Sequence, residues 1–161
     1  MATFGYTTLG SGSYEEADYM FGSKYALSET GVVSKLTVGI GDGLRSSDVK
    51  CAIYDSSFNL LATTQEVNVP IQAKDWVDFP FASPPTLSAG NYWLVVISKS
   101  IINKWNDAGD PNQGFYESQS YATAFPASFA PDVYENKKWS IYATDTPKAK
   151  TPLKWTPHSA I

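Results

Sequence analysis

One polar stretch of the chain combines aromatic side chains with amide and carboxylate groups. Trp105 stands between Lys104 and Asn106, so its ring does not belong to an apolar run. A sugar ring presents an apolar face of C–H groups that stacks on Trp or Tyr, while its hydroxyls need planar polar partners. The candidate ligand-binding residues are therefore Trp105, Tyr116, Tyr121, Asn103, Asn106, Asp107, Asn112 and Gln113, together with Trp76 from an earlier segment.

Two interpretations of these aromatic rings remain open. Trp76 faces away from the apolar side chains of its own segment, so it either contacts a ligand or covers that side of the fold. Trp105 likewise either contacts a ligand or packs on the core from an edge or loop. Trp93 lies in the most apolar segment and Trp139 alternates with Ile141, so both are predicted to be core residues.

Groups suited to covalent catalysis are scarce in this sequence. The single histidine, His158, falls in a Pro-rich tail, and the single cysteine, Cys51, lies in an alternating pattern typical of a buried residue. A Ser or Cys nucleophile therefore lacks a histidine base in the folded region, and a zinc site lacks ligands. We expect a protein that is not an enzyme. Glycoside hydrolysis by two carboxylates stays open, with Asp107, Asp110, Glu117 and Glu135 as candidates.

Acidic residues near both ends of the chain predict a structural calcium site. Glu15, Glu16 and Asp18 near the start can meet Asp145 near the end if the first and last strands are neighbours. Ca²⁺ takes six to eight oxygen ligands, which loop carboxylates and carbonyls supply. The alternative is that all four are ordinary surface acids.

Strand patterns dominate the segments that must position these residues. Apolar and polar residues alternate, or apolar runs are short, in residues 33–41, 49–53, 60–69, 76–81, 92–98 and 138–144. Turn residues such as Gly41-Asp42-Gly43 separate these segments. A repeat of short strands at roughly 8–12 residues, about eight to ten strands in all, predicts an all-β antiparallel β-sandwich of jelly-roll type.

Composition limits the class of protein. The 161 residues suit one domain, the net charge is −4, and lysines cluster too little to form a nucleic-acid-binding face. No stretch has the length of a membrane span, and the N-terminus lacks the regions of a signal peptide. We expect residues 1–145 to form the sandwich, and residues 146–161, with three Pro, to form a Pro/Lys/Thr-rich linker or tail. This tail favours a domain cut from a longer secreted protein.

Residues 87–97 read Leu-Ser-Ala-Gly-Asn-Tyr-Trp-Leu-Val-Val-Ile, an Ala-Gly-x-Tyr turn that enters a strongly apolar strand. Residues 4–8, Phe-Gly-Tyr-Thr-Thr, and 138–143, Lys-Trp-Ser-Ile-Tyr-Ala, look like the first and last strands of the same kind of module. In this pattern, residues 4–145 resemble the jelly-roll carbohydrate-binding modules of extracellular polysaccharide-degrading enzymes. The resemblance implies a fold and a ligand class, but no individual binding residue.

The predicted function is that of a non-catalytic carbohydrate-binding module, which targets a secreted multidomain protein to a polysaccharide by stacking on Trp105 and a Tyr. We expect an extracellular monomer joined to other domains, with poly- or oligosaccharide as its partner and neither nucleic acid nor membrane. Two alternatives stay open. One is a structural or adhesive domain of a phage tail fibre or surface filament, and the other is a small polysaccharide-acting enzyme.

Overall fold

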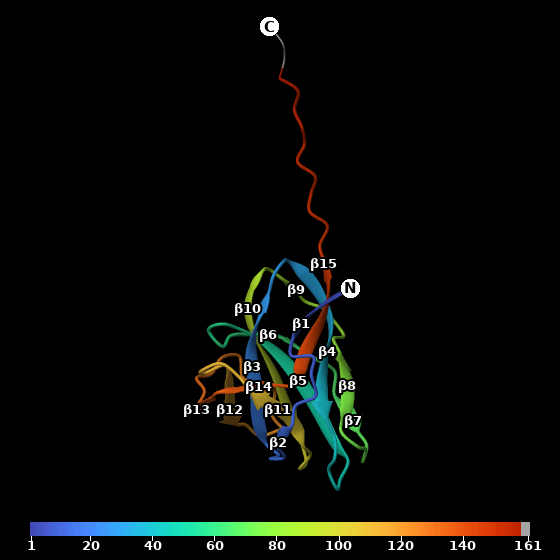
Figure 1. The fold of residues 1–161 in the computed structure, drawn as a ribbon, viewed down its shortest axis with the longest axis vertical. Helices are drawn as coiled ribbons and strands as arrows, with labels where there is room; N and C mark the ends of the chain where they lie inside the picture. Colours follow the sequence, from blue (N-terminus) through green and yellow to red (C-terminus); the bar gives the residue numbers. More distant parts are fainter. Residues whose placement is uncertain (159–161) are drawn as a thin grey trace.

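Two antiparallel sheets packed face to face make up the body of the molecule (Figure 1). The computed structural model describes residues 1–158, which contain fifteen strands and no helix. The predicted all-β sandwich is confirmed, whereas the jelly-roll connectivity stays a prediction. The strands exceed the eight to ten expected because the predicted run 60–69 is divided in two and because several strands have only two to four residues.

The first sheet, sheet A, is built around the long strand β4. β4 pairs with β15 along one edge and with β8 and β9 along the other, while β11 joins at its end through Lys104 and Ile40. β1 pairs with β15, as the predicted calcium site required. The strands of sheet A are β1 (Ala2–Gly5), β2 (Gly12–Tyr14), β4 (Gly31–Ile40), β8 (Asp75–Pro80), β9 (Thr86–Leu87), β11 (Lys104–Ala108), β14 (Lys137–Trp139) and β15 (Ile141–Pro147).

The second sheet, sheet B, has the order β13-β12-β3-β10-β5-β6, with β7 also beside β5. Its central strand, β10, pairs with β3 on one side and β5 on the other. The strands of sheet B are β3 (Tyr19–Leu27), β5 (Ser47–Asp55), β6 (Leu60–Thr63), β7 (Val67–Val69), β10 (Gly90–Ser98), β12 (Gly114–Ser118) and β13 (Val133–Glu135).

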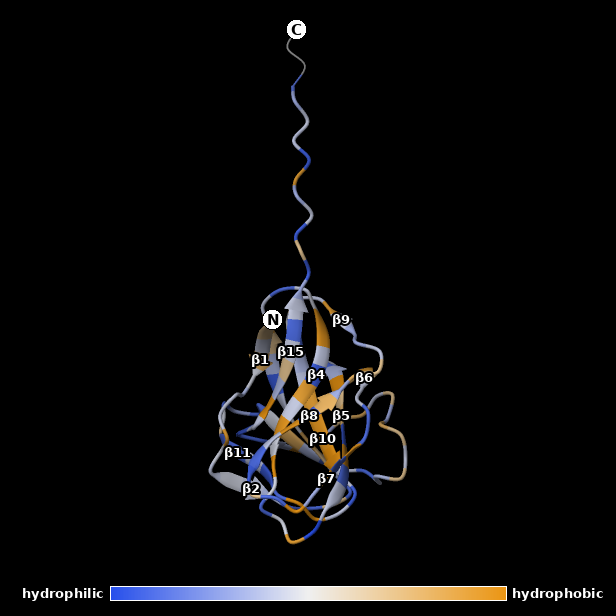
Figure 2. Ribbon diagram, turned by 90° about the vertical axis from the view of Figure 1, so that its right-hand side faces the viewer, coloured by the Kyte–Doolittle hydropathy of each residue, from blue (hydrophilic) through white to orange (hydrophobic). Residues whose placement is uncertain are grey.

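The main core lies between the two sheets, where alternate residues of each strand are apolar (Figure 2). Leu36 and Val38 of β4 belong to it, as do Cys51 and Ile53 of β5. Each strand places every second side chain on this inner face, which is why the period-two pattern was visible in the sequence. Trp139 is buried in this core, as predicted.

A second cluster of buried rings covers the outer face of sheet B. Trp93 of β10 stacks on Phe58, with ring centroids 4.6 Å apart. The segment 119–132 closes this cluster with Phe125, and Tyr54 Oη donates a hydrogen bond of 2.8 Å to the Pro126 carbonyl. Among the described residues this cluster has no counterpart on the outer face of sheet A, so sheet A keeps the more open face.

The chain leaves the sandwich at the end of β15, two residues beyond the predicted domain boundary. Lys148 N donates a hydrogen bond of 2.9 Å to the Thr30 carbonyl, and residues 149–158 then carry no strand. Figure 1 shows this segment projecting from the body, and Trp155 within it is 83 % exposed. Residues 1–158 include no helix of the length and apolarity needed to cross a membrane.

Candidate functional site

Two partly exposed aromatic rings lie side by side on the outer face of sheet A. Tyr142 of β15 and Trp76 of β8 meet in a T-shaped contact, with ring centroids 5.1 Å apart and planes at 71°. Their strands lie on opposite edges of β4, where Tyr142 pairs with Thr37 and Trp76 with Gly39. A Cβ on Gly39 would stand 2.8 Å from Leu9 Cδ2, so glycine lets Leu9 lie against the sheet beside the two rings.

Polar side chains surround Tyr142 on the same face. Asp78 accepts hydrogen bonds from Lys35 Nζ at 2.6 Å and from Thr37 Oγ1 at 2.7 Å. A shallow hollow of about 360 Å³ adjoins these groups, and it is lined by Met1, Ala2, Thr3, Lys35, Tyr142 and Thr144. This part of the face therefore offers a ring for stacking together with hydroxyl, ammonium and carboxylate groups for hydrogen bonding.

Trp105 of β11 also points to the outer face of sheet A. Its neighbours Lys104 and Asn106 are buried between the sheets, so alternation turns the Trp105 ring outward. Lys74 Nζ lies 4.0 Å from the ring centroid and donates a hydrogen bond of 2.7 Å to the Gly10 carbonyl. One face of the Trp105 indole is thus occupied by a cation of the protein itself.

Asp107, two residues along β11, holds the segment that follows β1. Its carboxylate accepts hydrogen bonds from Tyr6 Oη at 2.6 Å and from Ser11 N and Oγ at 2.9 and 3.1 Å. These hydrogen bonds, above all the one from Tyr6, hold the pKa of Asp107 below its usual range. Both oxygens are engaged, so Asp107 acts in this structure as an anchor for residues 6–11.

The remaining predicted polar residues make turn contacts away from this face. Asn103 Nδ2 donates to the Asp42 carbonyl at 2.9 Å, and Asn112 N donates to Asn136 Oδ1 at 3.0 Å. Gln113 Oε1 accepts from Asp110 N at 2.9 Å. Asn106 faces the interior, paired in register with Trp139. Of the predicted set, the outer face of sheet A collects Trp76, Trp105 and Asp107.

The two predicted tyrosines lie on the sheet B side of the molecule, Tyr116 in β12 and Tyr121 in the segment that covers the outer face. Tyr116 of β12 packs from the inner side against Phe21 and Tyr19, with centroid separations of 6.4 and 6.3 Å. Tyr121 is only 6 % exposed because its ring belongs to the second cluster. Neither ring shares a surface with Trp76 or Trp105.

Tyr142 is the functional candidate that sequence reasoning missed. It alternates with the buried residues Ile141 and Ala143, so the same pattern that assigned Trp139 to the core places Tyr142 on the opposite side. Thr37 lies opposite Tyr142 on the neighbouring strand, and Asp78 lies opposite Thr37 on the next one. These neighbours depend on the order of the strands in the sheet, which the sequence does not give.

The four predicted calcium ligands are not brought together. Asp145 pairs with Ala2 at the end of the sandwich where the chain begins and β15 finishes, whereas β2, which leads into Glu15, lies at the opposite end (Figure 1). The carbonyl of Glu16 and the backbone of Asp18 contact Lys104 and Ser98 there. Within residues 1–158 no three His, Cys, Asp or Glu side chains are grouped as metal ligands.

The candidate catalytic carboxylates also have structural partners. Glu117 Oε2 accepts a hydrogen bond of 2.7 Å from Asp132 N, and Glu135 Oε1 accepts one of 3.0 Å from Lys137 Nζ. Asp110 lies in the turn after β11, where its backbone N donates a hydrogen bond to Gln113 Oε1. These contacts bind loops and strand ends to sheet B.

No protein-family model and no curated protein matches this chain. The resemblance to jelly-roll carbohydrate-binding modules therefore stays a prediction from the sequence pattern.

Proposed function

We propose that this protein is a non-catalytic carbohydrate-binding domain that holds a polysaccharide or oligosaccharide chain against the outer face of sheet A. The observation that supports it is the pair formed by Tyr142 and Trp76, two partly exposed rings in contact on an open sheet face. The polar row of Lys35, Thr37 and Asp78 lies directly beside them.

Each group has a distinct part in this mechanism. The C–H face of a sugar unit stacks on Tyr142 or Trp76, which removes apolar area from water. The hydroxyls of that unit then exchange water for the Lys35 ammonium, the Asp78 carboxylate and the hydroxyl of Thr144. Because the face is shallow and the buried area small, we expect dissociation constants in the micromolar range or weaker.

Affinity electrophoresis against a panel of soluble polysaccharides tests this proposal. The parent protein is compared with Trp76→Ala and Tyr142→Ala, and Trp155→Ala serves as the matched control because Trp155 is exposed outside the sandwich. We expect at least one glycan to retard the parent and the control equally. Each face variant should lose most of that retardation, since a stacked ring contributes about 1 kcal/mol or more.

Thermal melting of every variant separates a binding defect from a folding defect. The proposal fails if no glycan retards the parent, or if both face variants are retarded as strongly as the parent while melting at the same temperature.

A structural or adhesive domain is the second candidate function. Leu44, Ile71 and Ile101 are exposed on three loops, and backbone bonds from Asp42 to Gln72 and from Gly41 to Asn103 bring those loops together. Such an apolar end suits packing against another protein or an identical copy. Sedimentation decides between the two: a binding module stays monomeric at micromolar concentration, whereas a filament or fibre subunit forms a stable oligomer.

A further inference from the structure

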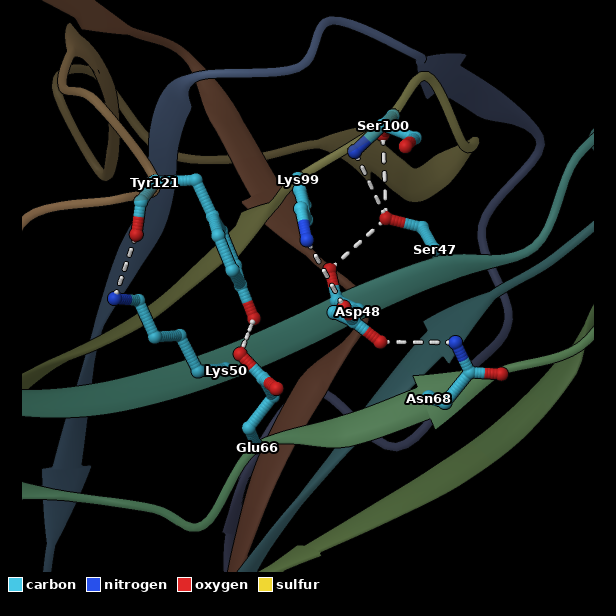
Figure 3. A network of polar contacts seen from close by, with 8 residues as sticks. All are labelled: Ser47, Asp48, Lys50, Glu66, Asn68, Lys99, Ser100 and Tyr121. Atoms are coloured by element: carbon cyan, nitrogen blue, oxygen red, sulfur yellow. Dashed lines mark hydrogen bonds and ion pairs between the residues drawn. The ribbon is translucent and has the colours of Figure 1, made fainter.

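A second hollow lies on the outer side of sheet B, where the cluster of buried rings gives way to charged side chains (Figure 3). Its volume of about 490 Å³ is within the range of roughly 300–1,000 Å³ that small-molecule sites occupy. The residues that line it are Asp18, Lys50, Glu66, Lys99, Ser120, Tyr121 and Ala122.

Tyr121 joins the two carboxylates of this hollow. Its backbone N donates a hydrogen bond of 2.7 Å to Asp18 Oδ1, and its hydroxyl donates one of 2.6 Å to Glu66 Oε2. Among the described residues, Asp18 Oδ2 and Glu66 Oε1 accept no hydrogen bond from a protein side chain or amide. Each carboxylate is therefore held through one oxygen and presents the other to a ligand.

Lys50 is fixed at the same place by the segment that covers the second cluster. Its Nζ donates hydrogen bonds of 3.0 Å to the carbonyls of both Tyr121 and Thr123, and lies 4.6 Å from the Tyr121 ring centroid. Figure 3 shows Lys50 beside the Tyr121 side chain and Glu66 at its hydroxyl end, and Tyr121 is only 6 % exposed. The tyrosine ring is thus covered, so a ligand here cannot bind by stacking on it.

Lys99 supplies a more exposed cation at the rim. Its side chain is 63 % exposed, and its Nζ lies 3.5 Å from Asp48 Oδ2. Asp48 is held in turn by Asn68 Nδ2, which donates to Asp48 Oδ1 at 2.9 Å. A long ion pair of an exposed lysine with a partly exposed carboxylate is weak, so Lys99 can donate to a ligand at little cost.

The balance of charge in this hollow selects the class of ligand. Two carboxylates and two ammonium groups line it. An anion in this hollow would be repelled by Asp18 or Glu66, and a metal ion would be repelled by Lys50 or Lys99. A hydroxyl group can donate to a carboxylate and also accept from an ammonium group. A compound with several neighbouring hydroxyls satisfies both kinds of partner without bringing a charge into the site.

We propose that this hollow binds a small neutral polyhydroxy compound, a free monosaccharide or the terminal unit of a glycan, by hydrogen bonds to Asp18, Glu66 and Lys99. This site lies on sheet B and is independent of the glycan face proposed on sheet A. Tyr121 is a positioning residue, since it orients both carboxylates through its amide and its hydroxyl.

Chemical-shift mapping with the unmodified protein is the first test. Amide spectra are recorded during titration with glucose, galactose, mannose and glycerol, and separately with glycine, inorganic phosphate and calcium chloride. We expect at least one neutral sugar to shift the amides of Ser120, Ala122 and Lys99 in a saturable manner. Saturable shifts at these amides with phosphate, glycine or calcium alone, or no saturable shifts there with any monosaccharide or disaccharide, overturn the proposal.

Variants then assign the contacts. Glu66→Gln and Asp18→Asn keep the shape of each side chain but remove the carboxylate charge, and we expect the sugar affinity to fall at least fivefold in each. Asp110→Asn is the matched control, because it makes the same change in an exposed turn. The proposal is overturned if Glu66→Gln and Asp18→Asn both bind the sugar as the parent does.

One comparison distinguishes this site from the proposed glycan face of sheet A. A second comparison distinguishes a free sugar from the end of a glycan as the ligand. Trp76→Ala should bind the monosaccharide normally, while Glu66→Gln should still be retarded by the polysaccharide. A monosaccharide that binds alone indicates a free sugar. A disaccharide that shifts the same amides when neither of its component sugars does indicates the end of a glycan.

Discussion

Lys104 is fully buried between the sheets, where an ammonium group loses its hydration. It is 0 % exposed, and its Nζ donates a hydrogen bond of 2.7 Å to the Glu16 carbonyl and lies 5.2 Å from the Phe21 ring centroid. Burial lowers the pKa of Lys104 to about 7, although Glu16 and Glu15 partly oppose this. In the unfolded chain the same group stays protonated up to a pH of about 10.

This difference gives the stability of the protein a predictable pH dependence. Between pH 7 and 10 the unfolded chain binds one more proton at Lys104 than the folded protein, so the free energy of unfolding rises with pH in that window. The contribution is about 1.4 kcal/mol per pH unit, or roughly 2 kcal/mol between pH 7 and 9. We expect Lys104→Met to abolish this rise, measured by urea denaturation at both pH values.

The quantity to compare is the difference between the two proteins, because Cys51 and other groups titrate in the same window in both. Lys24→Met, a change at an exposed lysine, is the control. Parallel stability profiles for the parent and Lys104→Met would show that Lys104 does not titrate in this way.

Asp145 is a buried carboxylate with an unfavourable environment. It is 2 % exposed, and among residues 1–158 neither of its oxygens has a hydrogen-bond partner. Burial, with a smaller contribution from Glu29, raises its pKa. The folded protein therefore binds the proton more tightly than the unfolded chain, and stability falls as pH rises from the unfolded pKa through the folded one.

We expect Asp145→Asn to raise the melting temperature at pH 7 and to leave it unchanged near pH 3, where both states of the parent are protonated. The gain should be about 1 kcal/mol, or roughly 2–4 °C for a domain of this size. Melting in EDTA and in calcium chloride completes the test. Calcium that stabilises the parent but not Asp145→Asn would instead identify a metal ion at this carboxylate.

The elements that the sequence revealed are those with one face in the main core. In β4, β5, β8 and β10 the apolar residues fall at every second position or run continuously, because these strands lie against the opposite sheet. β3 escaped prediction although it is central to sheet B. Its run Phe21-Gly22-Ser23 places a glycine and a serine at buried positions, which breaks the apolar pattern.

Gly22 is required by the close packing of β3 rather than by a turn. A Cβ at this position would stand 2.6 Å from Phe115 Cε1 and 2.8 Å from the Leu94 carbonyl oxygen of β10. The ring can shift only by disturbing the second cluster, and the carbonyl belongs to a central strand. We expect Gly22→Ala to destabilise the protein by about 1–3 kcal/mol in chemical denaturation.

Gly43→Ala is the matched control, because a Cβ there would meet its nearest atoms at an ordinary 3.5 Å. Equal stability of the two variants would mean that β3 and β10 can separate without cost, and that the glycine is not a packing requirement.

The sequence predicts only part of the candidate site, because alternation shows which way a strand residue faces but not what covers it. Alternation alone turned Trp76 outward, and the structure places it on the open face of sheet A. Tyr121 was placed among exposed candidates because its polar neighbours concealed its burial. Its ring belongs to the second cluster, most of whose members lie on strands β3, β5, β10 and β12. A contact between segments far apart in the chain leaves no periodic signal near either of them.

The two outer faces of the sandwich differ in how far they are covered. Segment 119–132 covers the outer face of sheet B, with the charged hollow beside Tyr121 at its border, whereas sheet A presents its aromatic pair on an open surface. A glycan chain that lies along sheet A and a small sugar held on sheet B would therefore not compete for the same protein groups. If both proposals hold, the two ligands bind simultaneously without mutual inhibition.

Of the described tail residues, those at its start make the backbone contacts with the sandwich. β15 pairs with β4 as far as Pro147 and Gly31, and Lys148 N makes the bond to Thr30 that follows. A protein ending at Lys148 keeps all of these contacts, so its melting temperature should stay within about 2 °C of the parent. A protein ending at Thr144 loses the pairs of Asp145, Thr146 and Pro147 with β4 and should melt clearly lower.

Glycan retardation should survive the first truncation, because Trp76, Tyr142 and their polar neighbours all precede it. If ending the chain at Lys148 lowers the melting temperature as much as ending it at Thr144, the tail packs on the sandwich and the sandwich is not stable without it.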